Sequence, residues 1–242
     1  MTSFVLSYGD ERILYQVTYD DHRSTRAAIH VNPDGFVSVD APIDFSESSI
    51  KLAVQKRARW VVNHVIEARG RYAHVRPKEY VSGEQVLYLG RRYVLKVVPV
   101  DKTVAVVRLK GNRLEVQSAS GSPDNIKGRI RAWYRVKGRD YLARRIDALT
   151  KTLPWTKTAP PFRLLDMTSQ WGSCSPAGEI ILNSHLIKAP RNCIDCVLIH
   201  ELAHLKHHDH GPEFWKLVDT HAGDWRKAKH HLDGLVEVLL SE

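Results

Sequence analysis

The segment HELAHL, residues 200–205, restricts the fold of this chain more than any other part of the sequence. In an α-helix, residues four apart lie about 6 Å apart along the axis and about 40° apart around it, so His200 and His204 project from one face. The opposite side of the same helix carries an apolar stripe: Ile194, Leu198, Leu202 and Leu205. The sequence therefore predicts a helix that packs its apolar face on a core and presents histidines to a cleft.

The two histidines have the spacing of metal ligands. Imidazole nitrogens one helical turn apart can converge on one ion at about 2.0–2.1 Å, and Glu201 beside them can reach a metal-bound water. This H-E-x-x-H arrangement is typical of zinc peptidases. It predicts one zinc ion per chain, held by His200 and His204, with Glu201 as the catalytic base.

A catalytic zinc needs a third protein ligand and an open position for water. The candidates that follow the motif are His207, His208, His210 and Glu213. His207 lies on the right face but a turn too far along a straight helix, and His208 has rotated away from that face. His210 precedes Gly211-Pro212, where the helix must end, so a turn there can bring His210 back over the metal. These considerations favour His210.

The rest of the chain predicts an α+β fold in three parts. Strand patterns and two hairpin signals, Asn32–Gly35 and Lys110–Asn112, predict a β-rich region with one helix at residues 1–122. A basic helix and a connector that contains Pro154 and Pro160-Pro161 follow at residues 123–160. Residues 161–242 form the expected catalytic domain. We find no internal sequence repeat.

Composition narrows the setting of the chain. No apolar run of about 18 residues predicts a membrane span, and the N-terminus lacks the pattern of a secretory signal. Three cysteines are too few for a disulfide framework, which favours the cytoplasm. The net charge is +9, and residues 129–151 hold eight basic side chains against two acidic ones. A solvated helix face is the simpler explanation of this charge, and attraction to nucleic acid is the alternative hypothesis.

In these motifs the chain resembles the YgjP-like metallopeptidases, which are relatives of the SprT-like and WLM zinc-peptidase groups. The elements of that family's pattern are present in order: Trp171–Ser175, Leu182-Asn183, Ala189-Pro190, Ile194-Asp195, His200–Leu205, His210-Gly211 and Phe214-Trp215. The similarity extends upstream over nearly the whole chain. One departure is Asp209, which stands where Asn is common and which we expect to tune the site.

The resemblance implies a C-terminal zincin-like domain with zinc bound by His200, His204 and His210. It implies hydrolysis of peptide bonds in peptide or protein substrates by a metal-bound water, with Glu201 as general base. Two alternatives stay open. The metal could stabilise a non-catalytic binding or regulatory module, or the basic surface could direct a peptidase to proteins on DNA, as in SprT-like proteins.

Further residues are candidates for supporting roles. Trp171, Gly172, Ser173 and Ile181 could rim a substrate cleft, with the strand EIILN, residues 179–183, as an exposed edge that pairs with an extended peptide. A tight turn with Trp171 in the core is an equal alternative. Asn183 and Asp195 could orient the ligating imidazoles, although Asp195 could instead support the start of the helix. We expect Cys193 and Cys196 to be buried, reduced thiols.

Overall fold

The computed structural model describes residues 2–20, 25–32, 35–72, 78–101, 106–167 and 170–241. The chain divides into two compact units, Met1–Arg76 and Pro77–Glu242. Strands and helices occur in both units, so the predicted α+β class is confirmed. Within the described residues, no helix combines the length and the apolar character that crossing a membrane requires.

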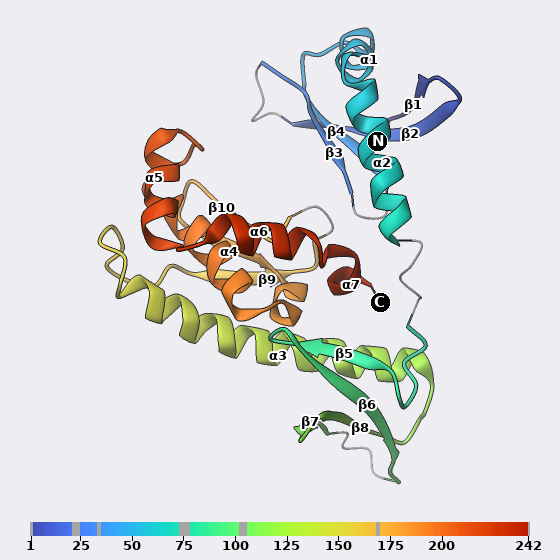
Figure 1. Cartoon of the computed structure of the whole chain (residues 1–242), viewed down its shortest axis with the longest axis vertical. Helices are drawn as coiled ribbons and strands as arrows, with labels where there is room; N and C mark the ends of the chain where they lie inside the picture. Colours follow the sequence, from blue (N-terminus) through green and yellow to red (C-terminus); the bar gives the residue numbers. More distant parts are fainter. Residues whose placement is uncertain are drawn as a thin grey trace. The chain divides into compact units, whose positions relative to one another are not determined.

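The first unit is a four-stranded sheet covered by two helices rather than the predicted one, because the backbone leaves the helical conformation at Arg57, the C-cap of the first helix. Its elements are β1 (Thr2–Tyr8), β2 (Glu11–Asp20), β3 (Ala28–Val31), β4 (Val37–Pro42), α1 (Glu47–Lys56) and α2 (Ala58–Tyr72). The strand order is β1-β2-β4-β3, and the two helices lie along one face of this sheet (Figure 1). Ser46 is the N-cap of α1, where its hydroxyl accepts a hydrogen bond from the backbone N–H of Ser49 (3.2 Å). Two residues of the predicted hairpin turn, Pro33 and Asp34, lie outside the described residues.

The second unit begins with another four-stranded sheet and a long helix. Its elements are β5 (Gln85–Tyr88), β6 (Arg91–Pro99), β7 (Val107–Lys110), β8 (Arg113–Ser118) and α3 (Pro123–Thr150). Buried residues in the first half of α3, such as Ile126 and Ile130, pack against this sheet. Buried residues in its second half, such as Leu142 and Ile146, belong to the core beneath the C-terminal elements. A 28-residue helix therefore joins two hydrophobic cores.

The two four-stranded sheets share one topology, although the sequence shows no repeat. The orders β1-β2-β4-β3 and β5-β6-β8-β7 correspond strand by strand, with a parallel central pair and an antiparallel strand on each side. In each, a serine N-cap follows the last strand at the same distance, Ser46 after Pro42 and Ser122 after Ser118. The fold repeats because the alternation of apolar residues and the cap positions repeat, while the residues themselves differ.

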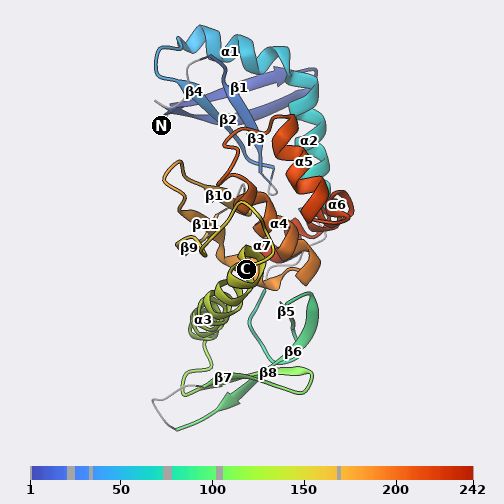
Figure 2. The same ribbon diagram turned by 90° about the vertical axis from the view of Figure 1, so that its left-hand side faces the viewer.

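The C-terminal elements form a small sheet packed on helices. They are β9 (Phe162–Leu165), β10 (Gly172–Cys174), β11 (Ile180–Asn183), η1 (Ser184–Lys188), α4 (Arg191–Ala203), α5 (Pro212–His221), α6 (Trp225–Asp233) and α7 (Val236–Leu240). The sheet order is β10-β11-β9, so β11 is the central strand. The prediction of residues 179–183 as an exposed edge is therefore wrong, because β10 and β9 occupy the two sides of β11. Figure 2 shows β10 near α4.

The compact units divide the chain at a different place from the predicted boundary at residue 122. The turn between β5 and β6 is hydrogen-bonded to η1, since the N–H groups of Leu89 and Gly90 donate to the carbonyls of Ile187 (2.9 Å) and Lys188 (3.1 Å). A Cβ on Gly90 would lie 2.7 Å from Cα of Pro190, so only glycine fits this approach. The second sheet and α3 therefore belong to the unit that carries the histidines.

Candidate metal centre

Helix α4 is anchored by its apolar side. Ile194, Leu198 and Leu202 are fully buried in the core, as the stripe predicts. The helix ends earlier than predicted, at Ala203, with His204 as its C-cap. The indole N–H of Trp155 donates to the carbonyl of Leu202 (2.8 Å) and so satisfies one of the carbonyls that a helix end leaves without a partner.

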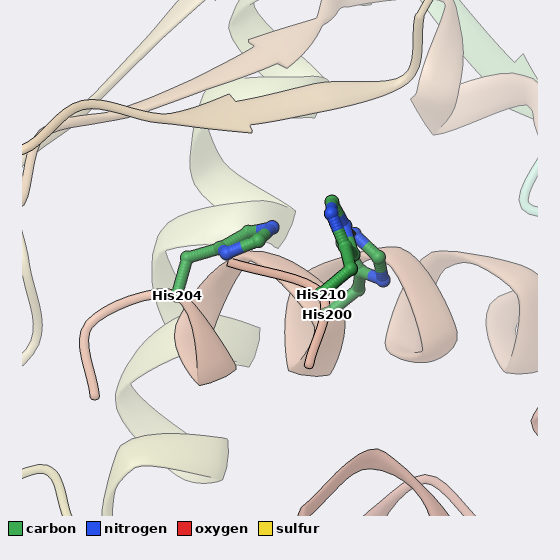
Figure 3. Close-up of side chains that lie close together, drawn as sticks. All are labelled: His200, His204 and His210. Atoms are coloured by element: carbon green, nitrogen blue, oxygen red, sulfur yellow. Dashed lines mark hydrogen bonds between the residues drawn. The ribbon is translucent and has the colours of Figure 1, made fainter. Parts of the chain in front are cut away.

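Three histidines converge above this helix. One nitrogen from each of His200, His204 and His210 lies within 4.8 Å of the others. Figure 3 shows the rings of His200 and His204 on α4, with His210 brought beside them by a separate segment of chain. Because the helix has already ended, the chain needs no turn at Gly211 to return; the loop before α5 carries His210 back. His207 and His208 are not part of the cluster.

The surroundings of the rings set their orientation. Nδ1 of His204 lies 3.1 Å from the carbonyl of His207, so Nδ1 carries the proton that it donates and Nε2 is left as a bare acceptor. Phe214, which is fully buried, packs against all three rings with centroid separations of 4.9, 4.5 and 4.7 Å to His200, His204 and His210. The side chains are therefore held in place before any ligand arrives.

The geometry and charge of the cluster suit a metal ion. Two nitrogens bound to one tetrahedral zinc at about 2.0–2.1 Å are about 3.3–3.4 Å apart. The Nε2 atoms of His200 and His210 are 3.1 Å apart, close to that separation. Burial lowers the pKa of His200 to about 4 and lowers the pKa of His204, with the neighbouring histidines adding to both shifts. Both rings are thus neutral at pH 7, the form in which imidazole binds a metal.

Glu201 lies beside the histidines in an apolar environment. Its side chain is only 5% exposed, and burial raises its pKa to about 8. Within the described part of the chain, Oε2 is buried and has no hydrogen-bond partner. A buried carboxyl oxygen without a hydrogen-bond partner costs free energy. Such unsatisfied groups are common where a side chain serves catalysis or binding rather than stability.

Gly172, at the start of β10, allows this position of Glu201. A Cβ added at residue 172 would lie 2.7 Å from Oε1, 2.8 Å from Cγ and 2.9 Å from Cδ of Glu201. Gly172 pairs with Leu182, and paired residues of two strands project on the same face of a sheet. A Cβ at residue 172 would therefore point to the core face, towards α4. Trp171 and Gly172 can therefore lie beside the site, because the Glu201 carboxylate fills the space that a side chain at residue 172 would occupy.

The other predicted cleft residues separate into two groups. Trp171 and Gly172 line a pocket next to His200 and Glu201, and Trp171 also packs on the core, so both interpretations of Trp171 hold together. Ser173 pairs with Ile181, and this pair lies on the opposite face of the small sheet from Leu182. Neither Ser173 nor Ile181 lines that pocket.

The two residues predicted to orient the imidazoles make other contacts. The side-chain amide of Asn183 donates to the carbonyls of Met167 (2.7 Å) and Gln170 (3.0 Å), which fixes the chain just before β10. Asp195 accepts two hydrogen bonds from Arg145 of α3, at 2.5 and 2.9 Å. Asp195 therefore ties α4 to α3, and it lies beyond the first turn of α4, whose N-cap is Pro190, so it does not cap the helix.

The thiols and the basic helix face also have defined environments. Cys174, Cys193 and Cys196 are free cysteines, and burial raises the pKa of Cys193 and of Cys196 to about 11. On α3, Arg129 bonds to Asn125 and Arg135 to Asp166, as Arg145 does to Asp195. These contacts use part of the basic face internally, and attraction to nucleic acid stays a prediction.

Sequence reasoning missed the contribution of α6. Trp225, Lys229 and Asp233 are spaced by four residues, so they share one face of α6, and all three line the pocket beside His200. The i, i+4, i+8 spacing was a usable signal for a common face. Nothing in the sequence placed that face against α4.

An H-E-x-x-H helix whose two histidines meet a third histidine, with the glutamate of the motif buried beside them, has the arrangement typical of metallopeptidases. The YgjP-like metallopeptidase domain matches residues 25–234 as a family model. The chain therefore belongs to the YgjP-like family. It is similar to the solved metallopeptidase zymogen abylysin of Pyrococcus abyssi, with 21% identity, a TM-score of 0.32, and coverage of 38% of this chain and 91% of that one. No curated protein matches the chain.

Proposed function

We propose that this chain is a zinc-dependent peptidase that binds one zinc ion through His200, His204 and His210 and uses Glu201 as general base. One observation carries the proposal: three imidazole nitrogens lie within 4.8 Å of one another beside a buried carboxylate oxygen without a partner. Membership of the YgjP-like metallopeptidase family supports the same conclusion.

The roles of the residues follow from their positions. A zinc ion bound by the three imidazoles would acidify a water molecule and polarise a peptide carbonyl. A nearby zinc cation would lower the raised pKa of Glu201, so that at neutral pH its ionised carboxylate takes a proton from the attacking water and returns it to the leaving amine. Phe214 and the backbone carbonyl of His207 keep the imidazole rings in fixed positions and orientations during the reaction.

An extended peptide substrate has a place to bind at the small sheet. β10 pairs with β11 on one side, and in the described structure no strand pairs with its other side. β10 also contacts α4, and Gly172 touches Glu201. A peptide that added to this edge as a further strand would run past the carboxylate, which moves the predicted strand addition from β11 to β10.

A purely structural metal site has less support. Such sites are closed by four protein ligands, whereas catalytic sites keep one position open. Among the described residues, His200, His204 and His210 form a three-membered cluster that no further His, Cys, Asp or Glu side chain joins. The donor set therefore favours an open position for water.

Metal content and hydrolysis test the proposal. We expect close to one zinc per purified chain by mass spectrometry, a strong loss in His210→Ala, and retention in the matched control His207→Ala, because His207 contributes its carbonyl rather than its ring. We expect Glu201→Gln to keep zinc and lose peptide hydrolysis by a factor of about 10²–10⁴, the usual contribution of a general base. Zinc in His210→Ala, or full activity in Glu201→Gln, would refute the assignment.

A further inference from the structure

A pocket of about 220 Å³ opens beside the histidine cluster. His200 and Glu201 form part of its wall, so it is continuous with the centre described above. Its other lining residues come from the segment at β10, from α4 and from the helices α5 and α6: Trp171, Gly172, Cys196, Val197, Trp215, Val218, Trp225, Lys229, Leu232 and Asp233. The first unit contributes none of them.

The walls of this pocket are mostly apolar and partly aromatic. Trp215 stacks on Trp225, with ring centroids 4.9 Å apart and an interplanar angle of 16°, so these two indoles form one rigid surface. The indole N–H of Trp225 donates to Asp219 (2.7 Å), which fixes the orientation of the pair. Val218 and Leu232 are buried behind them. Flat aromatic surfaces of this kind favour a flat or bulky apolar guest.

Apart from Glu201, the charged residues that line the pocket are Lys229 and Asp233, and they neutralise each other. Nζ of Lys229 donates to the carboxylate of Asp233 at 2.6 Å, one turn apart on α6. The thiol of Cys196 is neutral at pH 7, since burial raises its pKa to about 11. Away from Glu201 the pocket therefore offers no net charge to a guest, and a charged side chain would lose hydration there without gaining a counter-ion.

From this lining we infer that the pocket binds a large apolar side chain, preferentially aromatic, of the substrate residue next to the scissile bond. The inference rests on the proposed peptidase function and adds its specificity. Neighbouring Cα atoms are about 3.8 Å apart. A peptide whose carbonyl is placed at Glu201 therefore has the side chain of an adjacent residue within reach of a pocket that Glu201 and His200 themselves border.

Peptides that differ at one position test this specificity. The substrates are a set of alanine-rich decapeptides in which a single residue is Phe, Leu, Ala, Lys or Glu, with cleavage sites read by mass spectrometry. We expect cleavage next to Phe, with kcat/KM about 100-fold above the Ala peptide, since one methylene alone in a snug pocket is worth about tenfold or more. The Lys and Glu peptides are expected to be cut no faster than the Ala peptide.

A matched pair of variants links the preference to this pocket. Cys196→Phe places a ring inside the pocket, one turn before His200, whereas Cys196→Ala leaves it open. We expect Cys196→Phe to lower the ratio of kcat/KM for the Phe peptide to that for the Ala peptide from about 100 to about 1, whereas Cys196→Ala keeps a ratio well above about 10. Zinc content and the melting temperature of both variants show that the centre is intact.

A charge variant gives a second test that does not depend on Cys196→Phe folding. Lys229→Met leaves the Asp233 carboxylate without its counter-ion at the edge of the pocket. We expect the Lys peptide to become a better substrate than the Glu peptide by about fivefold, the factor that corresponds to a partly exposed ion-pair effect of ~1 kcal/mol. Asp224→Asn removes an acidic side chain on the same helix that does not line the pocket, and serves as the control.

The outcomes separate this inference from the function on which it rests. Cleavage of all peptides at equal rates, or an equal loss on Phe and Ala peptides in Cys196→Phe, overturns the pocket assignment and leaves the peptidase standing. Absence of cleavage by zinc-loaded protein overturns both. Binding of the Phe peptide to Glu201→Gln, followed by calorimetry, provides a readout besides turnover: affinity equal to that of the Ala peptide also counts against the pocket.

Discussion

Gly172→Ala is the sharpest single test of how the centre is built. The added Cβ would lie 2.7 Å from Oε1, 2.8 Å from Cγ and 2.9 Å from Cδ of Glu201, whereas ordinary contacts begin at 3.4 Å. Oε1 of Glu201 must therefore move away by about 0.7 Å, the difference between the 3.4 Å of an ordinary contact and 2.7 Å, because the interior is tightly packed. The backbone of residue 172 can accommodate alanine, because its φ is not in the left-handed region.

The size of the effect follows from the displacement. A misplacement of about 1 Å in a reacting group can lower the rate about 10²-fold. We therefore expect Gly172→Ala to lower kcat/KM for peptide hydrolysis by about 10–100-fold and to cost about 1–3 kcal/mol of stability through overpacking. The three atoms nearest to this Cβ all belong to Glu201 and none to a histidine, so we expect the zinc content not to change.

Gly128→Ala provides the matched control. A Cβ at Gly128 in α3 meets no atom within 4 Å, so this variant should keep full activity and gain about 0.5–1 kcal/mol of stability from its higher helix propensity. Peptide hydrolysis, zinc content and urea unfolding are measured on both variants. Gly172→Ala with activity within twofold of wild type would refute the reasoning, because it would mean that the position of Glu201 does not matter.

Two further predictions concern the support of the centre. Arg145→Met removes the partner of Asp195 between α3 and α4, and we expect urea unfolding to show a loss of about 1 kcal/mol, since the pair is well oriented but partly exposed; an unchanged midpoint would show that α4 is held by its apolar stripe alone. Cys193 and Cys196 should react negligibly with iodoacetamide at pH 8, and appreciably only near pH 10–11 or after unfolding. The thiolate is the reactive form, and burial raises the pKa of both thiols to about 11. Rapid labelling of Cys193 or Cys196 in the folded protein at pH 8 would contradict this.

Local sequence signals predicted the elements of this fold well. Helix α3 begins at Pro123, the predicted start of the basic helix, and ends at Thr150 before the proline-containing connector, because a proline can open a helix and further prolines close the stretch after it. The starts of α1 after Ser46 and of α5 at Pro212 obey equally local rules, since a serine N-cap or a first-turn proline depends on a few neighbouring residues. The convergence of His200 and His204 followed from helix geometry alone.

Features set by tertiary contacts could not be predicted in this way. β10 contains only three residues, two of them the small Gly172 and Ser173, and it is a strand because β11 supplies its hydrogen bonds. β11 is the central strand because β9 pairs with it in parallel. β9 follows the connector, and nothing in its sequence predicts that pairing. Likewise, the space that Gly172 leaves for Glu201 exists only once β10 lies on α4.

The five histidines from His200 to His210 have different uses in the structure. His200, His204 and His210 bring nitrogens together, while His207 contributes only its backbone carbonyl, which fixes the tautomer of His204. The side chain of His208 is exposed. This division depends on the early end of α4, because a helix continued past His204 would hold the carbonyl of His207 within its own hydrogen bonding and carry His210 away from the cluster. The loop between Ala203 and Pro212 is therefore as much a part of the centre as the H-E-x-x-H motif, and its length fixes which histidine can complete the set.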